Sequence, residues 1–215
     1  MEAPYSARRP LKSRGLRFFQ ELAAFLAKQG ATPNGISIVG VVFALLAALA
    51  FSSIGSLTGL AERMAWVAGA AMVQLRLVCN LLDGMVAVEH GRATVTGPFF
   101  NEAPDRLADV LILLGFAAAT QAWVPGLAAA LGSVATAYTR VLGAELGVGH
   151  CFHGPMAKPH RMAILTLATL VFAFGPATWT MDGVAWVLWL ITLGCGITVV
   201  RRIAWIFIKL AGSKP

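Results

Sequence analysis

Residues 80–109 read NLLDGMVAVEHGRATVTGPFFNEAPDRLAD, and this polar stretch joins two of the most apolar segments of the chain. Ten Asp and Glu residues occur in the whole sequence, and five of them fall in this window: Asp83, Glu89, Glu102, Asp105 and Asp109. Ionisable residues within membrane segments are costly, and they usually mark functional sites. The window therefore predicts a polar site where two membrane helices reach the water.

The composition points to a multispanning membrane protein. Hydrophobic residues make up 58% of the 215 residues, charged residues make up 13%, and the mean hydropathy is +0.74, which is too apolar for a soluble domain. A helix of about 20 mostly apolar residues can cross a bilayer. Six segments approximately meet this length: 35–56, 64–88, 98–119, 122–144, 160–178 and 184–207. We therefore expect an all-α integral membrane protein with six transmembrane helices.

The segment from Leu11 to Lys28 mixes apolar residues with basic and polar ones. This pattern is typical of an amphipathic helix that lies on the membrane surface, and the alternative is a basic tail that only sets the topology. No loop is long enough to fold separately. We expect a cytoplasmic or interfacial segment at 1–34 and a six-helix membrane domain at 35–215.

The basic residues predict the orientation. If the N-terminus is cytoplasmic, basic residues from Arg8 and Arg9 through to Lys214 fall on the inner side, and the outer loops carry only Arg63. Cytoplasmic loops are enriched in Lys and Arg. We expect both termini and the polar site on the cytoplasmic side.

Polar residues in the window recur at helical spacing. Residues three and four apart share a helix face, which groups Arg76, Asn80 and Asp83 on one helix and Asn101, Asp105 and Asp109 on the next. Carboxylate and amide oxygens that converge are ligands for a hard divalent cation, which typically also binds substrate phosphates. The window thus predicts a Mg²⁺ or Mn²⁺ site with candidate ligands Asn80, Asp83, Asn101, Glu102, Asp105 and Asp109.

The same residues resemble the signature of the CDP-alcohol phosphotransferases, D-x2-D-G-x2-A-R-x8-G-x3-D-x3-D. Every spacing is kept by Asn80, Asp83, Gly84, Ala87, Val88, Gly97, Asn101 and Asp105. Thr32-Pro33-Asn34 is similar to the T-P-N entry of this family. The resemblance extends over essentially the whole chain, because six helices with cytoplasmic termini and an amphipathic lead-in are also expected.

The resemblance implies a reaction in phospholipid synthesis. A substituted phosphoryl group passes from a CDP-alcohol, for which we expect CDP-diacylglycerol, to a hydroxyl acceptor, and CMP leaves. Members of the family use two divalent cations for the pyrophosphate and the last aspartate, here Asp105, as the base. The resemblance also assigns Gly84, Ala87 and Gly97 to nucleotide binding. We expect a homodimer in lipid, in a bacterial inner membrane, with no nucleic-acid partner.

Three positions depart from the signature. Asn80 and Asn101 replace the first and third aspartates, and Val88 replaces the arginine. Asparagine still offers a carbonyl oxygen, but each replacement removes a negative charge, so the number of bound ions stays open.

Two acids are candidates to restore this charge. Glu102 stands beside Asn101, and Asp109 lies one helical turn beyond Asp105. A shifted register would make Asp105 the third aspartate and Asp109 the fourth, although it breaks the spacing from Gly97. The base is therefore Asp105 or Asp109.

Cationic residues are expected at the same membrane level. Arg76, Arg140, Lys158, His160 and Arg161 are suited to a phosphate on the donor or the acceptor. The alternative is that they only set the topology. For Arg76 the alternative is a buried ion pair with Asp83 or Asp109.

Two other functions are alternatives to the transferase. The two asparagines favour a catalytically impaired family member that binds nucleotide or lipid as a partner protein, whereas the retained Asp83 and Asp105 oppose it. A transporter or channel would need polar residues across the membrane. The outer halves of the predicted spans are nearly all apolar.

Overall fold

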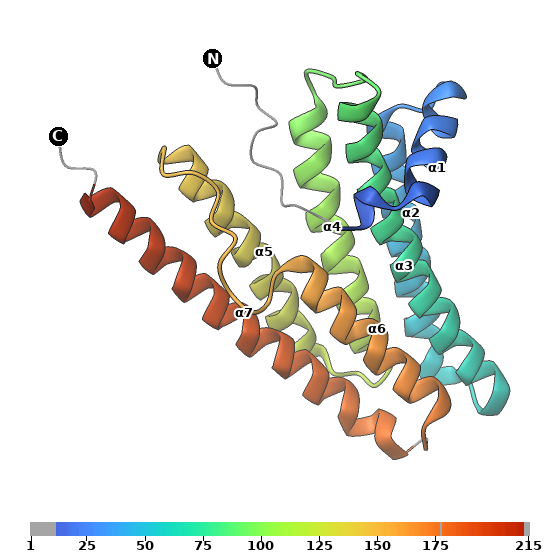
Figure 1. Ribbon diagram of the computed structural model, residues 1–215. Helices are drawn as coiled ribbons and strands as arrows, with labels where there is room; N and C mark the ends of the chain where they lie inside the picture. Colours follow the sequence, from blue (N-terminus) through green and yellow to red (C-terminus); the bar gives the residue numbers. More distant parts are fainter. Residues whose placement is uncertain (1–11, 177, 213–215) are drawn as a thin grey trace.

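The computed structural model describes residues 12–176 and 178–212, and these residues form helices joined by short links (Figure 1). The predictions that involve Arg8, Arg9, Leu11 and Lys214 lie outside the described residues. The elements are η1 Lys12–Gly15, α1 Arg17–Lys28, α2 Pro33–Ser53, η2 Ile54–Ser56, α3 Gly59–Glu89, α4 Gly97–Ala118, α5 Trp123–Glu145, α6 Lys158–Phe174 and α7 Thr178–Gly212.

The expected all-α membrane architecture is confirmed, and a helix occupies each of the six predicted segments. Within the described residues, four helical segments are long and apolar enough to cross a membrane: Pro33–Ser56, α3, α5 and α7. The other two are weaker candidates, because α4 carries four charged residues and α6 has only 17 residues. Six membrane spans therefore stay a prediction.

Two helices begin where their sequences predict a start. Thr32 precedes α2, and its Oγ1 accepts a 3.1 Å hydrogen bond from the backbone nitrogen of Gly35. This cap satisfies one of the unpaired amides of the first turn. Pro33 and Pro98 occupy the first turns of α2 and α4, where the missing N–H of proline costs nothing.

Other boundaries differ from the prediction. Helix α6 ends at Phe174, four residues early, because Gly175-Pro176 follows and a residue before proline is disfavoured in the α conformation. Helices α3 and α7 extend beyond the apolar segments at 64–88 and 184–207. Polar helix ends can continue into water, so hydropathy alone does not mark where they stop.

The helices pack in two groups. Helix α2 packs on α3 and α4, α5 packs on α7, and α4–α5 and α3–α6 contacts join the groups (Figure 1). At the crossing of α2 and α4, a Cβ on Gly115 would lie 2.4 Å from Ala48 Cα, so only glycine fits. An aromatic cluster from four helices fills the core: Phe51, Trp66, Phe116 and Phe172.

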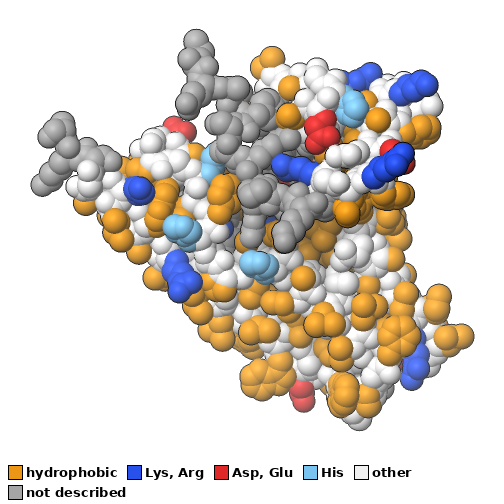
Figure 2. All heavy atoms as spheres, viewed as in Figure 1, with side chains coloured by type: hydrophobic (Ala, Val, Ile, Leu, Met, Phe, Trp, Pro, Cys, Tyr) orange, Lys and Arg blue, Asp and Glu red, His pale blue; other side chains and the backbone are white. Residues whose placement is uncertain are grey.

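A helix is present in the predicted amphipathic segment. Helix α1 lies beside α3 (Figure 1), with Ala23 and Ala27 buried and Phe18 and Phe25 exposed. In Figure 2, most charged side chains gather in the upper part of the view and hydrophobic side chains cover the lower part. The bundle thus has one polar end and an apolar body. A position of α1 on the membrane surface stays a prediction.

Candidate functional site

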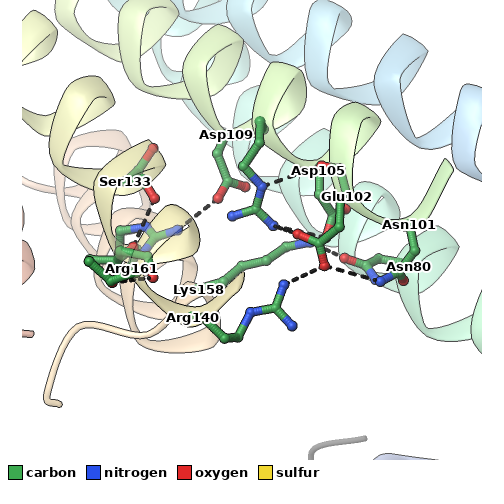
Figure 3. A network of polar contacts seen from close by, with 12 residues as sticks. Asn80, Asn101, Glu102, Asp105, Asp109, Ser133, Arg140, Lys158 and Arg161 are labelled. Atoms are coloured by element: carbon green, nitrogen blue, oxygen red, sulfur yellow. Dashed lines mark hydrogen bonds and ion pairs between the residues drawn. The ribbon is translucent and has the colours of Figure 1, made fainter. Parts of the chain in front are cut away.

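The site lies at the polar end, where acidic and amide side chains of α3 and α4 meet basic side chains of α5 and α6 (Figure 3). Arg76 is 1% exposed, and its Nη1 donates a 3.3 Å hydrogen bond to Asn80 Oδ1 one turn away. Its Nη2 lies 3.1 Å from both Asp105 Oδ1 and Asp109 Oδ1. Arg76 therefore links α3 to two acids of α4. The sequence left Asp83 and Asp109 as alternative ion-pair partners of Arg76, and the structure shows the pair with Asp109.

Asp109 is enclosed by arginines. Arg161 Nη2 donates a 2.8 Å hydrogen bond to Asp109 Oδ2, while Arg76 occupies Oδ1. Arg161 also donates to Thr136 Oγ1 at 3.1 Å and to the backbone oxygen of Met156 at 3.0 Å. Both carboxylate oxygens of Asp109 are thus paired in a network that joins α3, α4, α5 and α6.

Lys158 reaches between α3 and α4 from the start of α6 (Figure 3). Its Nζ lies 2.5 Å from Asp105 Oδ2, and it also donates to Asn80 Oδ1. Both acceptors belong to the predicted metal-ligand set, whereas Lys158 was predicted to bind phosphate.

Glu102 is paired with two arginines. It accepts from Arg140 on α5, and Arg106 Nη2 lies 3.5 Å from its Oε2. Asn101 Nδ2 lies 3.4 Å from Oε1 of the same carboxylate. The structure therefore brings Asn101 and Glu102 together with Arg140, as the sequence grouping suggests, but it surrounds Glu102 with positive charge.

Asp83 has one partnered and one unpartnered oxygen. It is 7% exposed, and Oδ2 accepts a 2.7 Å hydrogen bond from Ser37 on α2. Oδ1 is buried, and no described residue hydrogen-bonds to it. Sequence reasoning missed Ser37, although it is the only hydroxyl side chain in the otherwise apolar stretch 35–51.

The Thr32-Pro33-Asn34 entry holds the α3–α4 link in place. Asn34 Nδ2 donates a 3.0 Å hydrogen bond to Thr96, the residue that precedes α4. Arg92 in the same link donates to the backbone oxygen of Ala31 at 3.3 Å. These contacts tie the start of α2 to the segment that separates the two halves of the signature.

A cavity of about 500 Å³ opens between α3, α4, α5, α6 and α7. The predicted site residues on its wall are Asn80, Asn101, Glu102, Asp105, Arg140, Lys158 and Arg161. Sequence reasoning missed five polar residues of the wall or used them only for topology: Arg14, Gln74, Arg106, Thr136 and Arg202. A polar residue on a predicted apolar helix, such as Gln74, is the signal that could have identified them.

A second, much smaller cavity adjoins the first. Asn80 and Asp105 line both cavities, whereas Arg76, Asp83 and Ser37 line only the small one. Asp83 therefore lines a pocket that lies directly beside the large cavity.

Besides the buried Asp109, four predicted residues line neither cavity. Neither cavity is lined by Gly84, Ala87 or Gly97, the predicted nucleotide-binding residues. His160 is exposed, and its Nδ1 lies 2.7 Å from the backbone oxygen of Pro155. The assignments of these four residues stay predictions.

Positive charge balances the acids of the site. Four carboxylates face five basic side chains: Asp83, Glu102, Asp105 and Asp109 against Arg76, Arg106, Arg140, Lys158 and Arg161. In the α5–α6 link, burial and then the charge of Arg140 lower the pKa of His150 below its ordinary value. No three His, Cys, Asp or Glu side chains of the described residues form a metal-binding group. The walls are thus suited to an anion such as a phosphate.

Comparison with known proteins finds similarity to lipid synthases. No family model matches the chain. It is 26% identical to the phosphatidylinositol phosphate synthase of Streptomyces avermitilis, over 87% of this chain and 77% of the relative. It is 28% identical to the archaetidylinositol phosphate synthase of Methanothermobacter thermautotrophicus, over 81% of this chain and 83% of the relative.

Solved structures share the fold. The Mycobacterium tuberculosis phosphatidylinositol phosphate synthase with CDP-DAG bound has a TM-score of 0.73 and 22% identity, over 89% of this chain and 94% of that chain. The structure of that synthase with manganese and citrate also has a TM-score of 0.73, over 88% of each chain. Signature spacing, relatives that match over most of their length and a common fold agree: this chain is similar to the CDP-alcohol phosphotransferases in sequence and shares the fold of a solved phosphatidylinositol phosphate synthase.

Proposed function

We propose that this protein transfers the phosphatidyl group of CDP-diacylglycerol to a hydroxyl group of a phosphorylated polyol, with inositol phosphate as the candidate acceptor, and releases CMP. The observation that carries the proposal is the cavity of about 500 Å³ in which Asp105 lies among Arg140, Lys158 and Arg161. The relatives named as phosphatidylinositol phosphate and archaetidylinositol phosphate synthases support the acceptor class. A structure of one such synthase with CDP-DAG bound supports the donor.

The basic walls suit two phosphorylated substrates. Charged N–H groups make short, strong hydrogen bonds to phosphate oxygens, and the planar guanidinium of arginine can donate two at once. In this proposal Arg140, Lys158 and Arg161 bind phosphates of the donor and the acceptor. Gly84, Ala87 and Gly97 stay the proposed nucleotide contacts, and His160 stays a proposed phosphate contact.

In the proposed reaction, the acceptor oxygen attacks the phosphorus that carries diacylglycerol. A new oxygen–phosphorus bond forms, the bond from this phosphorus to the bridging oxygen breaks, and CMP leaves with the electron pair. The proton of the acceptor passes to a carboxylate. We assign this role to Asp105, because it lines the cavity, whereas Asp109 is 1% exposed and lines neither cavity.

The residues present fit a divalent cation at Asp83. Its Oδ1 is buried without a partner, and a hard cation such as Mg²⁺ or Mn²⁺ prefers oxygen ligands of this kind. When bound, the ion neutralises pyrophosphate charge and stabilises the leaving group. Asn80, Asn101, Glu102 and Asp105 stay proposed ligands, and the manganese-bound synthase structure supports a metal.

The membrane arrangement completes the proposal. Six spans, an interfacial segment at 1–34 and a membrane domain at 35–215 agree with the helices and their polar end. We place both termini and the cavity on the cytoplasmic side of a bacterial inner membrane, with the protein as a homodimer. The polar end carries most of the basic residues, which favours the cytoplasmic side.

CMP release tests the reaction. Purified protein in detergent is mixed with CDP-diacylglycerol labelled in the cytidine and with inositol phosphate, inositol or glycerol phosphate, in Mg²⁺, Mn²⁺ or a chelator. We expect CMP only with a phosphorylated acceptor and a divalent metal. Absence of CMP with every acceptor and metal would contradict the proposal.

One observation favours a second function, that of a catalytically impaired partner protein. Lys158 contacts both Asn80 and Asp105, so its ammonium group occupies the carboxylate that we assign as the base. Such a protein would bind CDP-diacylglycerol, which a shift in its unfolding temperature would reveal, and would release no CMP under any condition above.

A further inference from the structure

We infer that the ammonium group of Lys158 is a built-in cation that replaces one of the two divalent ions of the family, so that the site binds a single divalent ion at Asp83. The inference rests on the proposed function and deepens it. It concerns how this chain holds the positive charge that faces the pyrophosphate.

The position of the ammonium carries the inference. Lys158 Nζ lies 2.5 Å from Asp105 Oδ2 and also donates to Asn80 Oδ1. These two residues stand at the first and last acidic positions of the signature, on α3 and α4. A metal between the helices would need the same oxygens as ligands, and the ammonium already uses them.

The charges at this position change together. Asparagine at position 80 lacks the negative charge that an aspartate would bring. A divalent ion beside one amide and one carboxylate would leave a surplus positive charge next to Arg76, which is 1% exposed. The single positive charge of Lys158, which pairs with Asp105 beside Arg76, adds one unit less than a divalent ion would. Compared with the family signature and its two divalent ions, Asn80 removes one negative charge, and an ammonium in place of a divalent ion removes one positive charge. Asn80 and Lys158 therefore compensate each other in charge.

The nearby acids do not restore a second metal site. Asp109 is held by Arg76 and Arg161, and Glu102 is held by Arg140 and lies 3.5 Å from Arg106. A metal could use these carboxylates only by displacing buried or half-buried arginines.

One oxygen remains for a metal. Within the described residues, Asp83 Oδ1 is the only carboxylate oxygen among the buried side-chain atoms that have no hydrogen-bond partner. Asp83 is 7% exposed and lines the small cavity together with Asn80 and Asp105. The structure therefore offers one vacant carboxylate ligand beside one resident ammonium.

The test counts bound Mn²⁺ by electron paramagnetic resonance during titration of the full chain in detergent. We expect one Mn²⁺ per chain for the wild type. Asn80→Asp combined with Lys158→Met restores the acid and removes the ammonium, so we expect two. Asn80→Asp alone keeps the ammonium, and we expect one. Lys28→Met, at an exposed position on α1, is the matched control and should bind one.

Two bound Mn²⁺ in the wild type, none in the wild type, or one in a folded double variant would overturn the inference. Thermal unfolding shows whether the double variant is folded, and Asn80→Asp with Lys158→Gln repeats the test in a more polar form. CMP release is measured on the same samples. Two ions with CMP release would overturn only this inference, whereas one ion without CMP release would support the count and contradict the proposed function.

Discussion

Arg161 Nη2 donates a 2.8 Å hydrogen bond to Asp109 Oδ2, and both side chains are 1% exposed. Arg76 holds the other oxygen of the same carboxylate at 3.1 Å. A buried anion thus sits between two buried cations that come from α3 and α6. Because each charge has lost its water, the network is stable only while all three members are present.

We expect Asp109→Asn to destabilise the fold strongly. The change leaves the buried Arg161 without its counter-ion and leaves Arg76 with Asp105 alone, and breaking a buried pair costs about 3–5 kcal/mol. Thermal unfolding in detergent measures the loss. The control is Arg17→Ala, which removes the salt bridge between Arg17 and Glu21. The two side chains are 91% and 65% exposed, and exposed pairs contribute less than about 1 kcal/mol. Equal unfolding temperatures for Asp109→Asn and the wild type would contradict this account.

Asp105→Asn is expected to reduce CMP release by about 100- to 10,000-fold, the usual contribution of a general base. The amide cannot take the proton of the acceptor hydroxyl. CMP release under saturating donor and acceptor measures the effect, and CDP-diacylglycerol binding to the same variant shows that the cavity persists. Asp182→Asn, at an exposed position near the start of α7, is the control and should keep the wild-type rate. A fully active Asp105→Asn variant would remove Asp105 from the mechanism.

The helices and the grouping of polar residues on single helix faces could be predicted because both depend on local sequence. Long apolar stretches require helices in a membrane, and three- and four-residue spacing places Asn80 with Asp83 and Asn101 with Asp105 on single faces. Pairing across helices could not be predicted, because it depends on how α3, α4 and α6 cross. The contact of Lys158 with Asn80, which lies 78 positions away, is such a case.

Partners on α2 were hidden for the same reason. Ser37 reads as an isolated hydroxyl in an apolar span, and only the packing of α2 on α3 brings it to Asp83. Hydropathy could not predict the exact helix ends either, since α7 continues to Gly212 through a basic stretch.

We expect Ser37→Ala to weaken Mn²⁺ binding by about 10- to 100-fold, as is usual when a hydrogen bond that orients a metal ligand is lost. Without the 2.7 Å hydrogen bond from Ser37 to Oδ2, the carboxylate of Asp83 loses the contact that orients it beside the small cavity. Titration with Mn²⁺ gives the dissociation constant. Ser52→Ala is the matched control, because Ser52 lies on the same helix and is exposed. An unchanged constant for Ser37→Ala would show that Ser37 does not orient the ligand.

Arg140→Gln is expected to raise the KM for a phosphorylated acceptor by about 10- to 100-fold, since a hydrogen bond to a charged group is worth about 1.5–3 kcal/mol. The same change should leave kcat nearly unaltered if Arg140 holds the acceptor equally in the ground and transition states. Initial rates of CMP release against acceptor concentration separate the two constants. Arg201→Gln, at an exposed position on α7, should change neither. A fall in kcat alone would place Arg140 on the reacting phosphate instead of the acceptor.

Single cysteines at the two ends of α3 test the orientation. Arg63 and Glu89 are exposed, and at 1.5 Å per residue they lie about 40 Å apart, which exceeds the hydrocarbon core of a bilayer. In intact cells, a membrane-impermeant maleimide should label Arg63→Cys and should label Glu89→Cys only after permeabilisation. The natural thiols Cys79, Cys151 and Cys195 are buried, so the unsubstituted protein supplies the background. The reverse pattern would invert the topology, and labelling of both positions in intact cells would show that α3 does not span the membrane.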